Sequence, residues 1–249
     1  RYLGVALGQS IALGTCAGLG TIMGPVLLNI FFPENDPLSQ LTFSVILGVV
    51  VTLVGIAIIG VAGSMKAASL SEEEKKAAVK DFNFPKGLAI ALLAGFMSGC
   101  FNVGLEFGSG INFGELTDPM FRTLPATFLV TLGGFVTNAV YCFYQNSKNH
   151  TWGDYAKGDV MLNNVVFCLL AGALWYSQFF GLALGKGFLT SSPTLMTLSF
   201  CILMALNVVF SNVWGIILNE WKGCSRKTIT VLVIGIVVLV ISCFLPQLV

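Results

Sequence analysis

Residues 41–65 read LTFSVILGVVVTLVGIAIIGVAGSM and contain no charged side chain. The hydrocarbon core of a bilayer needs about 20 consecutive apolar residues for one spanning helix. In lipid the backbone of such a segment must satisfy its own hydrogen bonds, which a helix does within a single segment. This stretch therefore predicts a transmembrane helix, and the rest of the chain repeats the pattern.

Six further stretches are long and apolar enough to span a bilayer. The seven predicted helices cover about residues 3–32, 41–65, 87–109, 124–145, 161–185, 193–221 and 228–249. Charged residues make up only 10% of the 249, whereas soluble domains carry roughly 25%, so an ordinary soluble enzyme is excluded. The predicted fold class is an all-α membrane protein, a polytopic bundle of transmembrane helices.

Lysine and arginine are distributed very unequally between the two ends of these helices. If the chain starts on one side of the membrane at Arg1, that side receives 11 of the 13 basic residues. The other side receives only Arg122 and Lys186. Cytoplasmic loops carry the excess of basic residues, so the first side is predicted to be cytoplasmic and the C-terminus at Val249 periplasmic.

Glycine pairs four residues apart recur in the first and third predicted helices. They are Gly4/Gly8, Gly14/Gly18, Gly20/Gly24, Gly95/Gly99 and Gly104/Gly108. Small faces allow helix backbones to approach closely, so we expect these pairs to mark packing surfaces. A face that lines a sugar-sized cavity is the alternative.

Two valine-rich segments resemble each other, residues 46–54 (ILGVVVTLV) and residues 233–241 (VIGIVVLVI). When the loops are assigned to the two sides of the membrane by their lysine and arginine content, these two helices enter the membrane from opposite sides. Inverted repeats of this kind are common in secondary transporters. Any two valine-rich helices resemble each other, which explains the likeness of these segments more simply. The internal repeat is therefore a hypothesis.

The usual catalytic motifs are absent from the sequence, which has no HExxH, GxSxG, Walker A or Rossmann pattern. The seven cysteines form no CxxC pair. We therefore expect no enzyme activity, no metal and no cofactor. Nucleic acid is not an expected partner, because the formal net charge is only +1.

Glu106 is the one charged residue well within an apolar span. An ionisable group in a membrane helix is costly and commonly serves ion or proton coupling, so Glu106 is our candidate for proton coupling. Alternatively, Glu106 lies close enough to Ser109 to reach interfacial water.

Uncharged polar and aromatic residues recur in the other spans. Amides and hydroxyls with an aromatic face can recognise a neutral sugar, although each could equally make a hydrogen bond between helices. The substrate-binding candidates are Asn102, Asn138, Tyr141, Trp175, Tyr176, Gln178, Asn207, Ser211 and Trp214.

Three segments occur in the order found in a known family. They are Arg1-Tyr-Leu-Gly4 before a glycine-rich span, Trp175-Tyr-Ser-Gln-Phe-Phe180, and Glu220-Trp221 before a basic pair and a valine-rich last helix. With these features the chain resembles, from end to end, the L-rhamnose/proton symporter family of the drug/metabolite transporter superfamily. The resemblance is not complete, since a member of that family has a neutral asparagine where this chain has Glu106.

The resemblance implies ten helices in two inverted five-helix repeats, of which seven are present here. Residues 1–65 would be the last two helices of a truncated first repeat, and residues 66–86 a charged cytoplasmic loop. Residues 87–249 would be a complete five-helix second repeat.

The function expected from these features is uptake of L-rhamnose or a related sugar with a proton, by alternating access. The sugar would bind between the third to sixth helices. The expected location is the inner (plasma) membrane, with sugar, proton and lipid bilayer as partners. An exporter of drugs or metabolites with the same architecture is the first alternative, and a membrane scaffold that transports nothing is the second.

Overall fold

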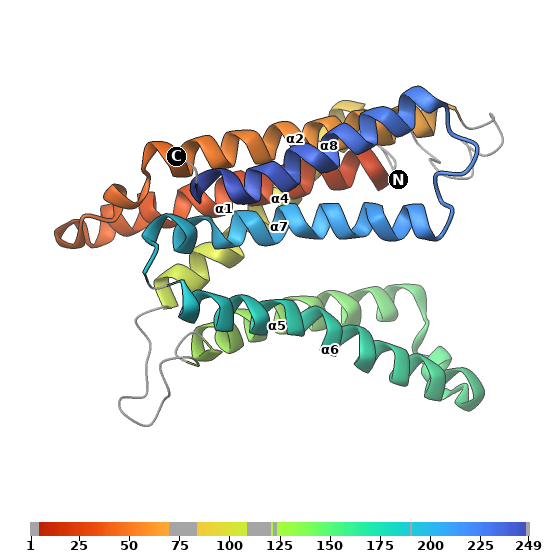
Figure 1. Cartoon of the computed structure of the whole chain (residues 1–249). Helices are drawn as coiled ribbons and strands as arrows, with labels where there is room; N and C mark the ends of the chain where they lie inside the picture. The colour runs from red at the N-terminus through yellow and green to blue at the C-terminus, as the bar shows by residue number, and fades with distance from the viewer. Residues whose placement is uncertain (1–4, 70–83, 109–120, 122–123, 190, 248–249) are drawn as a thin grey trace. The chain divides into compact units, whose positions relative to one another are not determined.

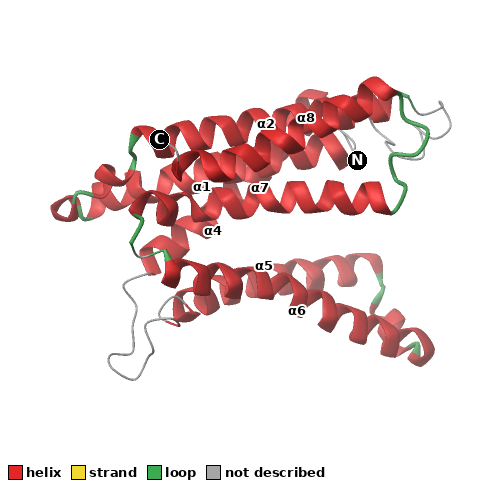
Figure 2. Ribbon diagram, in the orientation of Figure 1, coloured by secondary structure: helices red, strands yellow, loops and turns green. Residues whose placement is uncertain are grey.

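The computed structural model describes residues 5–69, 84–108, 121, 124–189 and 191–247. Every regular element in those ranges is a helix (Figure 2). Seven of the helices are long and apolar enough to cross a membrane, which confirms the predicted polytopic helical bundle. The long helices are α1 (Val5–Phe31), α2 (Phe43–Ala68), α4 (Phe84–Gly108), α5 (Leu124–Asn149), α6 (Gly158–Phe188), α7 (Pro193–Ile217) and α8 (Arg226–Phe244).

Short 3₁₀ helices join or follow some of these segments. They are η1 (Pro33–Asn35), η2 (Pro37–Gln40), η5 (Trp152–Ala156) and η6 (Leu245–Gln247).

Two of the long helices begin at side-chain caps. The hydroxyl of Thr42 accepts a hydrogen bond from the Val45 amide before α2, and that of Ser225 accepts one from the Thr228 amide before α8. Such caps satisfy amides that have no partner within the helix.

The chain forms two compact units. The first contains residues 1–103 and 189–249, and the second contains residues 104–188. In the first unit α1, α2, α7 and α8 pack against one another (Figure 1). Helix α4 contributes residues to both units.

Helices α2 and α8 make the most extensive contact in the first unit. A Cβ atom on Gly235 would lie 2.5 Å from Cγ1 of Ile59, so the two helices approach closely at this glycine. The Thr52 hydroxyl on α2 donates a buried hydrogen bond of 3.0 Å to Oγ of Ser242 on α8. The two similar valine-rich segments therefore lie on helices that pack against each other.

Helix α4 packs on α1 through the predicted glycine pair Gly95/Gly99. A Cβ atom on Gly95 would lie 2.5 Å from the carbonyl oxygen of Ala12, and one on Gly99 would lie 3.3 Å from the amide nitrogen of Gly20. These contacts confirm that this pair serves close helix packing. Asn102 lies just beyond it, is 2% exposed, and donates from Nδ2 to the Gly20 carbonyl at 2.6 Å.

Within the second unit, α5 and α6 are joined by a turn that contains η5. Trp152 packs edge-on against Phe143, with ring centroids 5.2 Å apart. Asn146 donates from Nδ2 to the Tyr155 hydroxyl at 3.0 Å and accepts a 2.9 Å hydrogen bond from the Thr151 hydroxyl. These contacts hold the turn against the C-terminal end of α5.

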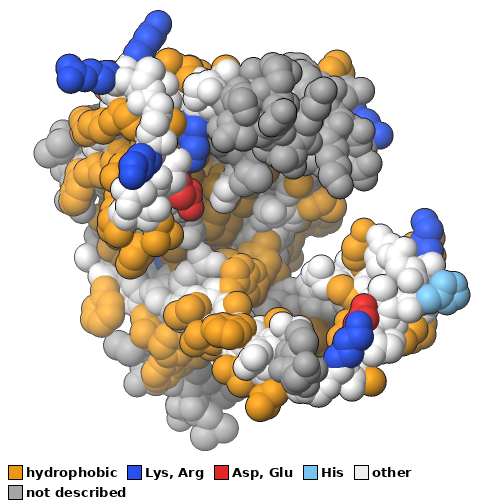
Figure 3. All heavy atoms as spheres, turned by 90° about the vertical axis from the view of Figure 1, so that its right-hand side faces the viewer, with side chains coloured by type: hydrophobic (Ala, Val, Ile, Leu, Met, Phe, Trp, Pro, Cys, Tyr) orange, Lys and Arg blue, Asp and Glu red, His pale blue; other side chains and the backbone are white. Residues whose placement is uncertain are grey.

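Large apolar side chains remain exposed on all seven long helices. Hydrophobic side chains accordingly make up much of the surface in Figure 3. Such an apolar surface suits a protein that lies in hydrocarbon, where exposed leucine or phenylalanine carries no penalty.

Several predicted helix ends differ from the structure by a few residues. Helix α2 continues to Ala68 and α4 begins at Phe84, so both ends of the predicted loop 66–86 are helical, while residues 70–83 lie outside the described ranges. Helix α7 ends at Ile217 and does not reach Trp221 as predicted. Its end is set by backbone geometry, because Asn219 adopts a left-handed conformation with φ 59°.

Candidate functional site

Glu106 forms an ion pair with Lys186. Nζ of Lys186 at the end of α6 donates to Oε1 of Glu106 at the end of α4, at 2.9 Å. The two side chains are 26% and 15% exposed, respectively. Partial burial weakens solvent screening, so this pair interacts more strongly than a surface pair would.

The partner of Glu106 was missed in the sequence. Lys186 was counted only as one of the two basic residues on the less basic side of the membrane. Glu106 lies near the end of the third predicted span on that same side, so the two opposite charges share a membrane depth. An ionisable residue within a span usually pairs with another, and this rule was the signal by which Lys186 could have been found.

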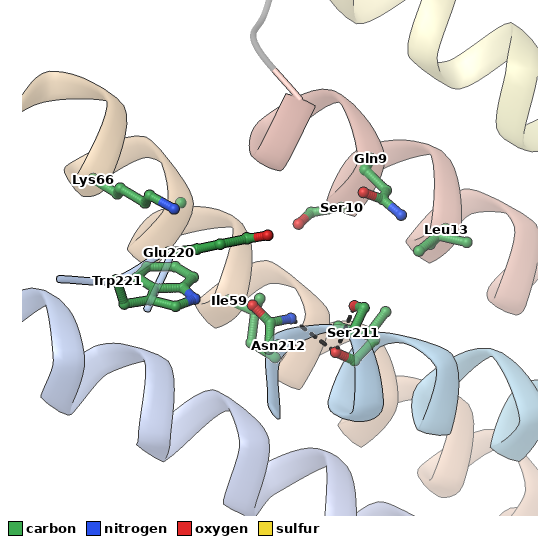
Figure 4. Close-up of a pocket in the computed structure, with 11 residues that line it drawn as sticks. Gln9, Ser10, Leu13, Ile59, Lys66, Ser211, Asn212, Glu220 and Trp221 are labelled. Carbon is green, nitrogen blue, oxygen red and sulfur yellow. Dashed lines mark hydrogen bonds between the residues drawn. The ribbon is translucent and has the colours of Figure 1, made fainter. Parts of the chain in front are cut away.

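The first unit contains a cavity of about 350 Å³ where three helices come together. Helix α1 contributes its N-terminal part, while α2 and α7 contribute their C-terminal parts (Figure 4). By the distribution of lysine and arginine, all three of these ends belong to the side predicted to be cytoplasmic.

The chain after α7 is folded so that two of its side chains reach this cavity. The amide of Asn219 donates to the Ile216 carbonyl at 3.1 Å, and the amide of Glu220 donates to the Gly215 carbonyl at 2.8 Å. This pair of bonds, with asparagine in the left-handed conformation, is a Schellman ending. It places the side chains of Glu220 and Trp221 in the wall of the cavity.

Lys66 lies over the indole of Trp221, with Nζ 4.6 Å from the ring centroid. Lysine above an aromatic face is attracted by the ring quadrupole, a contact worth about 0.5–2 kcal/mol depending on desolvation. This contact links the end of α2 to the turn that follows α7. Lys66 and Glu220 together bring one positive and one negative group to the cavity.

The predicted substrate residues of the first unit occupy different environments. Ser211 lines the cavity and donates to the Val208 carbonyl at 3.0 Å. Asn207 is exposed and donates to the Leu203 carbonyl at 3.1 Å, and Trp214 is 60% exposed. Asn102 is a buried contact between α1 and α4, as described above, and Oδ1 of its amide has no hydrogen-bond partner among the described residues.

The remaining candidates belong to the second unit. Trp175 packs edge-on against Phe179, with ring centroids 4.9 Å apart, while Tyr176 and Gln178 are partly buried. Asn138 donates to the Gly134 carbonyl within its own helix at 2.9 Å. The hydroxyl of Tyr141 accepts a 2.7 Å hydrogen bond from Gln145, also on α5.

Sequence reasoning missed most of the cavity. Lys66 was placed only within the charged loop of residues 66–86, and Glu220 and Trp221 were noted only in the resemblance. Pairing among these residues depends on which helices are neighbours, and the periodicity of a single helix carries no such information. A weak signal was available, because Lys66 and Glu220 are opposite charges assigned to the same side of the membrane.

Comparison with known proteins gives a consistent picture. A family model described as L-rhamnose-proton symport protein (RhaT) matches residues 1–248. Relatives named L-rhamnose-proton symporter in Yersinia pestis (strain Pestoides F) and Yersinia pseudotuberculosis serotype O:1b (strain IP 31758) are each 29% identical over 250 residues, covering 97% of this chain and 70% of the relative. A relative of the same name in Escherichia coli O1:K1 / APEC is 29% identical over 252 residues with the same coverage. No solved structure matches the chain.

Proposed function

Since this chain belongs to the L-rhamnose-proton symport protein (RhaT) family, we propose that it takes up L-rhamnose together with a proton. The observation that carries this proposal is the family match, which extends over nearly the whole chain. The relatives bear the name of a symporter, which describes a transporter and not an enzyme. No ATP-binding motif is needed, because the proton gradient supplies the driving force.

The protein is a multi-pass membrane protein, and its proposed location is the bacterial inner membrane. In the proposed orientation the ends of α1, α2 and α7 that form the cavity face the cytoplasm. The 11-to-2 distribution of lysine and arginine supports this orientation. The C-terminal end of the chain then lies on the periplasmic side.

Transport proceeds by alternating access between two inverted repeats. Residues 1–65 belong to the first repeat, residues 66–86 connect the repeats, and residues 87–249 make up the second. The antiparallel packing of α2 on α8 supports this division, since these helices carry the two similar valine-rich segments. Rocking of one repeat against the other exposes a central site to each side in turn.

Glu106 couples the proton to this movement. Its carboxylate is held by Lys186 at 2.9 Å while it is ionised. When Glu106 is protonated it loses its charge, the ion pair weakens, and the contact between α4 and α6 is released. The location of this pair at the ends of two spans supports a coupling role, because ionisable groups in membrane helices commonly mark proton paths.

The amide, hydroxyl and aromatic groups selected from the sequence recognise the sugar. These are Asn102, Asn138, Tyr141, Trp175, Tyr176, Gln178, Asn207, Ser211 and Trp214. Trp175 has the aromatic face that a pyranose ring requires, and its contact with Phe179 orients the indole. The amides and hydroxyls supply donors and acceptors for sugar hydroxyls.

The experiment that tests the proposal is uptake of labelled L-rhamnose by cells that produce the protein, with and without a proton uncoupler. The expected result is accumulation above the level of cells lacking the protein, abolished by the uncoupler. Uncoupler-insensitive uptake would contradict proton coupling. Absence of uptake by protein that is present in the membrane would contradict the sugar assignment.

A further inference from the structure

We propose that the cavity lined by α1, α2, α7 and the turn at Glu220 and Trp221 binds the sugar at the cytoplasmic end of its path. This inference rests on the proposed function. It assigns a second, inner binding position to a set of residues of which the sequence selected only Ser211. The argument depends on the size of the cavity, on hydrogen-bonding groups without partners, and on the balance of charge.

The cavity is suited to a small ligand. Its volume of about 350 Å³ lies at the lower end of the range of roughly 300–1,000 Å³ that ligand pockets occupy. A single monosaccharide fits this space, and a drug-sized molecule would need more. Leu13 and Ile59 provide an apolar part of the wall for the ring C–H groups and the methyl group of a 6-deoxy sugar.

Several polar groups in the cavity wall have unused hydrogen-bonding capacity. The side chains of Gln9, Ser10 and Glu220 have no hydrogen-bond partner among the described residues. Asn212 uses Nδ2 on the Val208 carbonyl at 2.8 Å, which leaves its amide oxygen available as an acceptor. Figure 4 shows the hydroxyl of Ser10 and the carboxylate of Glu220 directed into the same space from opposite walls.

This set of groups matches the chemistry of a polyol. Each sugar hydroxyl both donates and accepts, so a site that binds several of them needs donors and acceptors on more than one wall. The amide of Gln9 and the hydroxyl of Ser10 can do both, whereas Glu220 and the Asn212 oxygen accept. A carboxylate acceptor makes a stronger bond to a hydroxyl than a neutral acceptor does.

The charges in the wall favour a neutral ligand. Lys66 and Glu220 bring opposite charges to the cavity, so neither an anion nor a cation gains net attraction from this pair. The ammonium of Lys66 also lies over the Trp221 ring, which ties it to the wall at 4.6 Å from the centroid. L-rhamnose carries no charge and meets this requirement.

A second hollow, between α1 and α2, offers a contrast. Its volume of about 610 Å³ is larger, but its wall is mostly apolar. Two of its three hydroxyls are already engaged, because Thr15 donates to the Ile11 carbonyl at 2.8 Å and Ser64 donates to the Gly60 carbonyl at 3.0 Å. The third hydroxyl, that of Ser10, is shared with the proposed sugar position, which alone adds Gln9, Asn212 and Glu220.

The test measures sugar binding to the purified protein in lipid nanodiscs by calorimetry. The variants Glu220→Ala and Asn212→Ala should each raise the Kd for L-rhamnose about tenfold, since each removes a hydrogen bond made to the sugar. Matched controls are Glu34→Ala and Asn35→Ala in η1, at the opposite end of α1, which remove the same groups outside the cavity. The controls should leave the Kd unchanged.

A second measurement reports occupancy directly and does not depend on loss of affinity. In the variant Ser10→Cys, saturating L-rhamnose should slow alkylation of the new thiol by N-ethylmaleimide at least fivefold, measured on its peptide by mass spectrometry. A Ser39→Cys variant in η2 serves as the control and should react at the same rate with and without sugar.

The outcomes separate the two proposals. If wild-type protein takes up L-rhamnose but both cavity variants keep its Kd and the sugar does not protect Ser10→Cys, the inner site is wrong and the proposed function stands. If wild-type protein neither binds nor takes up L-rhamnose, both proposals are wrong.

Discussion

Glu106 and Lys186 are 80 residues apart in sequence and meet at 2.9 Å in the second unit. Hydropathy identified Glu106 because a carboxylate interrupts an apolar span. It did not identify Lys186, because a lysine near a span end is ordinary. Only the folded structure brings the ends of α4 and α6 together at this ion pair, so the candidate coupling group was predicted and its partner was not.

Removing either charge of this pair should abolish coupled transport. In Glu106→Gln and Lys186→Met we expect uncoupler-sensitive uptake of L-rhamnose to fall at least tenfold, because a partly buried charge is left without its partner or the proton carrier is lost. Uptake and the amount of protein in the membrane are measured together.

The exposed pair Asp154–Lys157 provides the control for this prediction. Its atoms are 2.7 Å apart but its side chains are more than half exposed, so it should contribute about 0–1 kcal/mol. Asp154→Asn should keep wild-type uptake. Full activity of Glu106→Gln would show that Glu106 is not needed for coupling.

Glycine residues, which lack a side chain, allow helix pairs in the first unit to pack at close range. The predicted pair Gly95/Gly99 lies against α1, and Gly235 lies against Ile59 of α2. The glycine spacing in the sequence predicted where close approach would occur on a helix, but not which helix would be the neighbour. Which helices become neighbours depends on the packing of the whole unit, and the spacing of glycines within one helix does not predict that packing.

Gly95→Ala should destabilise the protein. The added methyl group would lie 2.5 Å from a backbone oxygen, which cannot rotate away, so α1 and α4 must separate at an overpacking cost of about 1–3 kcal/mol. We expect the apparent Tm of the purified protein, followed by circular dichroism, to fall by several degrees.

Gly14→Ala is the matched control on α1. A Cβ atom there would lie 3.5 Å from Ile56 and 3.7 Å from Leu53, which are ordinary contacts. Alanine also has the higher helix propensity. Its Tm should stay the same or rise, and an equal fall in both variants would argue against the close-packing account.

At the scale of the whole molecule, the sequence predicted most ends of the seven spans to within a few residues. Bilayer thickness fixes the length of each apolar segment, so composition alone carries this information. The cavity could not be predicted in this way. Gln9, Lys66, Asn212 and Glu220 come from three distant parts of the chain, and only their common membrane side could be deduced.

The proposed orientation can be tested with a native residue. Cys224 lies in the connection between α7 and α8 and is partly exposed. A thiol reagent that cannot cross membranes should label Cys224 in inverted vesicles and not in right-side-out vesicles, as read from its peptide. A Ser39→Cys variant should show the opposite pattern, and the reverse result for both sites would invert the orientation.

The central claim is that sugar and proton move together, and it is tested most directly with purified protein in lightly buffered liposomes that lack any other transporter. Addition of L-rhamnose outside should alkalinise the external medium as protons enter with the sugar, and an uncoupler should remove the signal. Entry of labelled L-rhamnose without any movement of protons would contradict the account.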